Sequence, residues 1–111
     1  MTTWAAAISN ETASGNMDVC VIVCEQEWDG EKYQPVLTDA LAVDPVGLGV
    51  PASEAYAWDR AEQAAVDELA DRGWGITGDW DYADNAAYAT AIPAPGNPLR
   101  EQWTPEDEEP V

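Results

Sequence analysis

The sequence predicts an α+β domain in which one α-helix packs on a face of an antiparallel sheet of about four to five strands, in the order β-ββ-α-ββ. Three observations predict this class. An apolar, β-branched segment leads into Asp29-Gly30, a strong signal for a β-hairpin. Residues 54–72 carry apolar side chains at helical spacing and are followed by a glycine. Residues 74–82 alternate apolar and polar side chains, as a strand with one buried face does.

The first two strands are expected within residues 4–9 and 18–24. The first segment, WAAAIS, alternates Trp4, Ala6 and Ile8 with smaller side chains, which favours a strand, although an alanine run also permits the start of a helix. The second segment, DVCVIVC, is apolar on both faces. We therefore expect it to form a central strand that is covered on both sides.

The hairpin that follows is expected to turn tightly at Asp29-Gly30. With these two residues as the turn, Glu27 lies opposite Lys32, and the two can pair across the strands. The return strand, residues 31–38, contains Pro35, which has no backbone donor and is tolerated at a sheet edge. The sequence therefore predicts an edge strand here.

A single helix is expected over residues 54–72. Ser53 suits the N-cap position, and Gly73 suits the first position beyond the helix, where a left-handed backbone is common. The preceding segment DPVGLGVP, residues 44–51, is expected to be a loop. Five apolar side chains share the helix face that we assign to the sheet: Trp58, Ala61, Ala65, Val66 and Leu69. Glu62 falls inside this arc and is expected at its margin.

A second hairpin is expected from residue 74 onward. Asp84-Asn85 can turn the strand of residues 74–82 back into AAYATAI, residues 86–92. Large side chains then oppose small ones in two pairs: Trp80 with Ala89, and Tyr82 with Ala87.

The chain is expected to form one domain and a tail. Its 111 residues suffice for one hydrophobic core and are too few for two. The run PAPGNP closes the domain, which we assign to residues 1–95. Residues 96–111 are acidic and are expected to form a flexible tail.

Abundant alanine, scarce lysine and the absence of phenylalanine are typical of a GC-rich genome, such as that of an actinobacterium or one of its phages.

The charge of the chain limits its partners. Asp and Glu number 22 against 4 Lys and Arg, with no His, which gives a formal net charge of -18. Direct binding to DNA, RNA or an anionic membrane requires a basic patch, which this composition does not supply. We therefore expect a protein partner with a basic surface, and neither nucleic-acid nor membrane binding. The longest apolar run, residues 19–24, is too short to span a membrane.

Cysteine chemistry is not expected. Cys20 and Cys24 lie four residues apart in one expected strand, about 13 Å from each other, which is beyond the reach of a disulfide. No His is present to activate either thiol. We expect two buried, apolar thiols in a reducing cytoplasm.

Asp79 and Asp81 are candidates for carboxylate chemistry, because they lie two positions apart on one strand face. Their separation of about 7 Å suits an inverting glycosidase pair. A one-helix domain of this size hardly encloses a sugar-sized cleft, however, and the stretch lacks the glycine and glutamate of a calcium loop. We therefore expect a solvated strand face, with no enzymatic activity, metal or cofactor.

These observations predict a small, acidic, non-enzymatic protein that binds and inhibits or regulates a protein target. The protein would bind a basic surface of the target, such as a surface that binds nucleic acid. It would then act like a DNA-mimic inhibitor of phage or mobile-element origin. The candidate partner-binding residues are acids and aromatics: Glu25, Glu27, Trp28, Asp59, Asp67, Asp71, Asp79, Asp81 and Trp103. The alternative is an antitoxin-like or adaptor protein whose Trp-rich hairpins form a protein interface. The sequence leaves the oligomeric state open.

Overall fold

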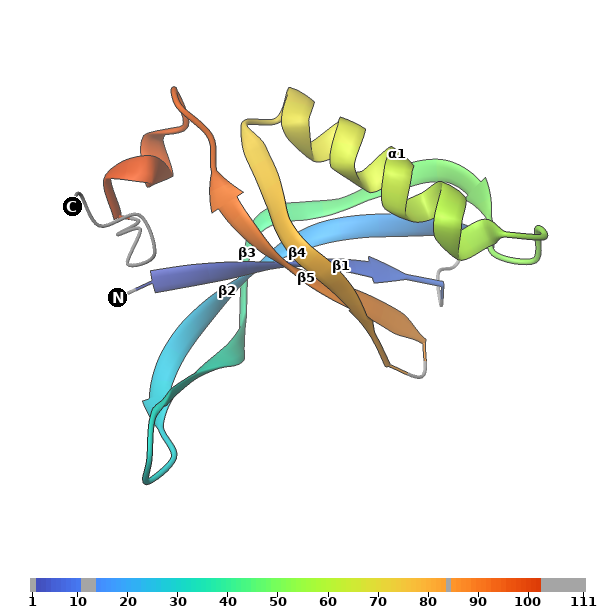
Figure 1. Cartoon of the computed structure of the whole chain (residues 1–111). Helices are drawn as coiled ribbons and strands as arrows, with labels where there is room; N and C mark the ends of the chain where they lie inside the picture. Colours follow the sequence, from blue (N-terminus) through green and yellow to red (C-terminus); the bar gives the residue numbers. More distant parts are fainter. Residues whose placement is uncertain (1, 11–13, 84, 103–111) are drawn as a thin grey trace.

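The computed structural model describes residues 2–10, 14–83 and 85–102. It contains a five-stranded antiparallel sheet in the order β3-β2-β1-β5-β4, with one α-helix lying across one face (Figure 1). The predicted α+β class is therefore confirmed. The elements are β1 (Thr2–Ser9), β2 (Asn16–Trp28), β3 (Tyr33–Pro51), α1 (Ala57–Asp71), β4 (Trp74–Tyr82), β5 (Ala86–Pro93) and the 3-10 helix η1 (Pro98–Gln102).

The first strand is the centre of the sheet. Trp4, Ala6 and Ile8 of β1 are buried and point towards α1, and this alternation is that of a strand. Valines of β2 oppose them on one side and alanines of β5 on the other. The small side chains of β5 leave room for the helix to approach the sheet closely. The alanine run of β1 thus forms a strand because every second side chain enters the core.

The helix begins later than the sequence predicts. Ser53 does not cap it, because the chain first turns, with the Glu54 amide donating to the Pro51 carbonyl (3.0 Å), and then passes through Tyr56 at φ 59°. A residue in this left-handed conformation does not belong to an α-helix, so the helix starts at Ala57. Its end agrees with the prediction, since Gly73 follows the last turn with φ 87°.

The buried line of the helix runs at every fourth residue, through Ala57, Ala61, Ala65 and Leu69. Trp58 packs at its border, as predicted. Val66 does not share this face and is 37% exposed, which corrects the predicted arc. The predicted arc is too wide because a helix that rests on alanines buries only a narrow stripe of side chains.

The first hairpin has a four-residue loop, and the predicted pairing is wrong. Trp28 lies opposite Tyr33, and Glu27 lies opposite Gln34, not Lys32. The reason is Asp29, whose carboxylate accepts bonds from the backbone amides of residues 31 and 32 (2.9 and 3.0 Å). This side-chain cap stabilises a wider loop than the two-residue turn.

The third strand is much longer than predicted and includes residues 44–51, which the sequence assigns to a loop. Val46, Leu48 and Val50 alternate with two glycines. Val50, only 3% exposed, belongs to the core and Leu48 packs against it, whereas Val46 lies opposite the buried Val19 of β2. The glycines and prolines hid this alternation. Irregular register with β2 bends the strand at several points, and β3 forms an edge of the sheet as expected from Pro35.

The second hairpin is also bulged. Tyr82 pairs with Ala87 as predicted, but the register shifts between Thr77 and Asp81, and Trp80 lies in this irregular stretch. The predicted pairing of Trp80 with Ala89 is absent from the described register. Trp80 nevertheless packs against the core on the helix side.

The described chain continues past residue 95. Leu99 of η1 packs against the core, and the Arg100 guanidinium donates to the Pro93 carbonyl (2.7 Å). Residues 96–102, predicted as part of the tail, therefore belong with the domain in the structure. The remainder of the predicted tail lies outside the described residues.

Candidate binding surface on the open face of the sheet

The sheet has one face that α1 covers and one that no described element covers, here called the open face. Trp4, Ala6 and Ile8 point towards the helix, so the residues that alternate with them in β1 point to the opposite face of the sheet. The residues of β2 and β5 that pair with those alternate residues point to the same opposite face. The open face carries these side chains, among others: Ala5, Ala7, Cys20, Ile22, Cys24, Gln26, Trp28, Tyr33, Pro35, Leu37, Leu41, Tyr88 and Thr90.

The prediction that β2 is covered on both sides is therefore wrong. On the helix side, Met17, Val19 and Val21 are fully buried. On the open side, Cys20 and Ile22 are half-buried, and Cys24 is buried by its neighbours. The apolar pattern of β2 comes from a core on one side and from a largely apolar, accessible surface on the other.

A groove of about 410 Å³ crosses this open face. Its floor is β1, and its walls come from β2 with β3 on one side and from β4 with β5 on the other. Since both edge strands of the sheet line one groove, the sheet curls towards its open face. The lining side chains on this face are Thr3, Ala5, Cys24, Gln26, Pro35, Leu37, Thr77, Asp79, Asp81, Tyr88 and Thr90.

Hydrogen bonds fix part of the groove wall. The Gln26 side-chain amide donates to the Thr3 hydroxyl (3.1 Å), which links β2 to β1. The Thr38 hydroxyl donates to the Val23 carbonyl (2.8 Å) and links β3 to β2. These bonds hold the wall in place without occupying the groove.

The two thiols of the open face are poor nucleophiles. Burial raises the pKa of the Cys24 thiol, which is 3% exposed. Burial also raises the pKa of the Cys20 thiol, and the nearby Asp18 carboxylate raises it further. Both thiols are free and stay protonated at neutral pH. The expected burial holds for Cys24, whereas Cys20 is half-buried.

An exposed aromatic pair extends the open face along the β2–β3 hairpin, which projects away from the body of the sheet (Figure 1). The rings of Trp28 and Tyr33 meet edge to face, with centroids 5.2 Å apart, and are 59% and 65% exposed. Leu37 and Leu41 continue this surface and are also exposed. Contiguous exposed apolar side chains of this kind mark interaction sites.

The predicted acidic residues do not share one face. Asp79 and Asp81 line the groove on the open face. Asp59, Asp67 and Asp71 are exposed on the outer side of α1, which lies on the other side of the sheet (Figure 1). Glu25 and Glu27 are exposed on β2 and alternate with Trp28, so they point away from the aromatic pair. Trp103 lies outside the described residues.

Few cations offset these acids. Arg60 pairs with Glu54, and Arg72 pairs with Glu68 at 3.0 Å, both between residues close in sequence. Arg100 donates to a backbone carbonyl. No Lys or Arg is among the described residues that line the groove, although two carboxylates are. The groove is therefore anionic as well as partly apolar.

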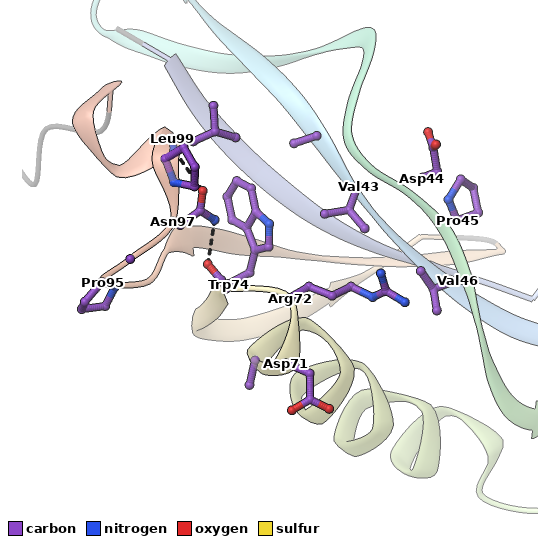
Figure 2. Close-up of a pocket in the computed structure, with 15 residues that line it drawn as sticks. Val43, Asp44, Pro45, Val46, Asp71, Arg72, Trp74, Pro95, Asn97 and Leu99 are labelled. Atoms are coloured by element: carbon purple, nitrogen blue, oxygen red, sulfur yellow. Dashed lines mark hydrogen bonds between the residues drawn. The ribbon is translucent and has the colours of Figure 1, made fainter.

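A second hollow, of about 860 Å³, lies on the helix side between β3, the end of α1 and the C-terminal segment (Figure 2). Trp74 forms its floor, and the Asn97 side chain donates to the Gly73 carbonyl (2.7 Å) at its rim. Trp74 also meets Trp4 edge to face (5.4 Å) in the core. This hollow is a junction between elements, and Arg72, the one cation among the described residues that line it, already pairs with Glu68.

Two kinds of feature are absent from residues 2–10, 14–83 and 85–102. Within these residues, no three Cys, Asp or Glu side chains gather into a group that could hold a metal ion. Among them, too, no helix has the length and apolar character needed to cross a membrane. Comparison of the chain with protein families, with curated proteins and with solved structures finds no match.

Sequence reasoning identifies Trp28, Tyr33, Asp79 and Asp81 of this surface but not Leu37 and Leu41. The direct pairing of Trp28 with Tyr33 is not predicted, because a two-residue turn at Asp29-Gly30 places Glu31 opposite Trp28. The alternation of Leu37, Asp39 and Leu41 is irregular in β3, so the pattern does not identify which face these leucines occupy.

Proposed function

We propose that the protein is a non-enzymatic binding protein that attaches to a basic surface of a protein target and thereby inhibits or regulates it. Its formal charge of -18 supports this proposal, because such a chain is attracted to cationic surfaces and repelled by nucleic acid and anionic membranes. The absence of His and the raised pKa values of both thiols support the non-enzymatic part. The free thiols favour a reducing compartment such as the cytoplasm.

One observation carries the proposal: the open face combines exposed apolar side chains with carboxylates and leaves both accessible. An apolar surface provides affinity, and surrounding charge provides attraction and selectivity for a partner of opposite sign. The nucleic-acid-binding surface of an enzyme is the kind of basic surface that such a protein would occupy. Blocking that surface would inhibit the target without any chemistry.

The proposal is tested by affinity capture from a host lysate, with the immobilised full-length chain, at low and at high salt. We expect proteins with basic surfaces to be retained at low salt and largely released at high salt, because screening removes the attraction between exposed charges. A matched bead that carries a neutral protein of similar size measures background. Retention that is equal at both salt concentrations would contradict the proposal.

A second candidate function is that of an adaptor or antitoxin-like protein that assembles through its hairpins. The exposed Trp28–Tyr33 pair favours this candidate, since aromatic anchors often dominate protein interfaces. Here the contact would be mainly apolar, and the complex would persist at high salt. Sedimentation at both salt concentrations, alone and with a captured protein, separates the two candidates.

A further inference from the structure

We infer that the groove on the open face receives a cationic, amphipathic segment of the partner, with Arg or Lys at the Asp79–Asp81 rim and apolar side chains against Pro35 and Leu37. This inference rests on the proposed function and names the part of the partner that is bound. It also assigns the positioning of the partner to the open face, whereas the acids on the helix side contribute only general attraction.

The size of the groove determines the kind of occupant. About 410 Å³ lies within the range of small-molecule sites, so the groove has room for a few side chains and is far too small for a folded domain. The floor and one wall offer Ala5, Pro35 and Leu37, which are apolar and accessible. A segment that inserts a few apolar side chains fits this wall.

The charge of the rim determines what else the segment carries. Asp79 and Asp81 are both exposed on β4 and stand on the wall opposite Leu37. A guanidinium can bind a carboxylate through two parallel hydrogen bonds, which positions the segment as well as attracting it. An occupant that alternates cationic and apolar side chains therefore meets both walls at once.

A second copy of this chain is a poor occupant. Two copies that met through their open faces would each bring Asp79 and Asp81 to the contact, on chains that each carry a charge of -18. Like charges that are brought together oppose association. A basic partner removes this conflict.

The test uses two synthetic peptides of equal charge: one alternates arginine and leucine, and the other is an oligolysine. Each is titrated into the isotope-labelled full-length protein and followed by amide NMR. We expect the arginine–leucine peptide to shift the amides of Thr3, Leu37 and Thr90 in the groove. Oligolysine is expected to shift amides near acids on both sides of the sheet. Groove amides that do not respond to the arginine–leucine peptide overturn the inference.

Two matched double variants decide whether the rim acts locally. D79N/D81N is expected to weaken binding of the arginine–leucine peptide about three- to tenfold, as the loss of two exposed ion pairs would. D67N/D71N removes the same charge from the outer side of α1 and is expected to change binding less than about twofold. Equal effects of the two variants would show only general attraction by net charge, and would overturn the inference while leaving the proposed function intact.

A third variant tests the apolar wall. Leu37 is 46% exposed on an edge strand, so L37S should leave the fold unchanged. We expect it to weaken binding of the arginine–leucine peptide several-fold and to leave oligolysine binding unaltered. A variant that binds both peptides as the wild type does would overturn the inference. The proposed function would fail separately, if the lysate capture retained no basic protein at low salt.

Discussion

At the scale of single residues, Tyr82 connects the helix to the outer strand β4. Its ring meets Trp58 edge to face, with centroids 5.6 Å apart, and its hydroxyl donates to the Glu62 carboxylate. This contact explains why a carboxylate sits at the margin of the helix face that packs on the sheet. The bond to Glu62, burial and the nearby negative charges raise the pKa of Tyr82 to about 12.

This contact predicts a pH-dependent effect of Tyr82→Phe. The folded-state pKa lies above the ordinary value of 10.0, so the bond stabilises the fold fully below pH 10 and is lost as the pH rises through about 12. Because Tyr82 is 57% exposed, solvent screens the effect, and we expect Tyr82→Phe to cost about 0.5–1 kcal/mol at neutral pH.

Urea unfolding of both proteins from pH 8 to pH 12 measures this difference. We expect the free energies of unfolding to converge between about pH 10 and pH 12, as the wild-type bond is lost. A difference that stays constant over the whole range would mean that the hydroxyl makes no such bond.

At the scale of elements, the start of α1 provides a test of the structure against the sequence pattern. A serine that caps a helix typically contributes about 1 kcal/mol, and Ser53 occupies the position that the pattern assigns to the cap. In the structure the helix instead follows Tyr56, whose φ of 59° is unfavourable for a residue with a Cβ.

We therefore expect Ser53→Ala to change the free energy of unfolding by less than about 0.5 kcal/mol. Tyr56→Gly is expected to stabilise the fold by about 0.5–1 kcal/mol, because glycine relieves the left-handed strain but loses more entropy on folding. Thermal and urea unfolding of the two variants measure both effects. A loss of about 1 kcal/mol in Ser53→Ala would restore Ser53 as the cap.

Some of the strands could be predicted from the sequence, whereas the extent of β3 and the register of the first hairpin could not. Hydrophobic alternation was sufficient for β1, β4 and β5, because each has one buried face. The extent of β3 was missed because its residues 44–51 contain prolines and glycines that elsewhere mark loops. The hairpin register was missed because it depends on Asp29, whose carboxylate bonds to the loop amides and selects four residues instead of two.

The candidate site could be predicted only in part. Acids and Trp28 are recognisable from composition, but the side of the sheet on which each lies depends on bulges and on the helix position. Asp79 and Asp81 share the groove with Leu37 only because the sheet curls. No local pattern encodes this contact between the two edges of the sheet.

At the scale of the whole molecule, the charge is large for the size. The longest extent is 44 Å, and a DNA duplex of that length carries about 26 phosphate charges, against a formal charge of -18 for this chain. The acids lie on both sides of the sheet, however, so any one face presents only part of them. In the proposed complex, attraction over a distance would therefore come from the whole chain, and positioning would come from the open face.

Self-repulsion at this charge predicts that salt stabilises the fold. Added salt screens the repulsion between exposed carboxylates, because the Debye length of the solution falls from about 30 Å at 0.01 M to about 8 Å at 0.15 M ionic strength. We expect the free energy of unfolding to rise when sodium chloride is added over this range, as measured by urea unfolding. A free energy of unfolding that stays constant or falls with added salt would show that self-repulsion does not limit stability.

The central claim is that charge brings this protein to a basic partner. It is tested most directly by the dissociation constant of a captured partner, measured by calorimetry across a series of sodium chloride concentrations. The account predicts that the constant rises steeply with salt, in a linear relation between the two logarithms, as attraction between opposite charges requires. A dissociation constant that does not change with salt would contradict the claim.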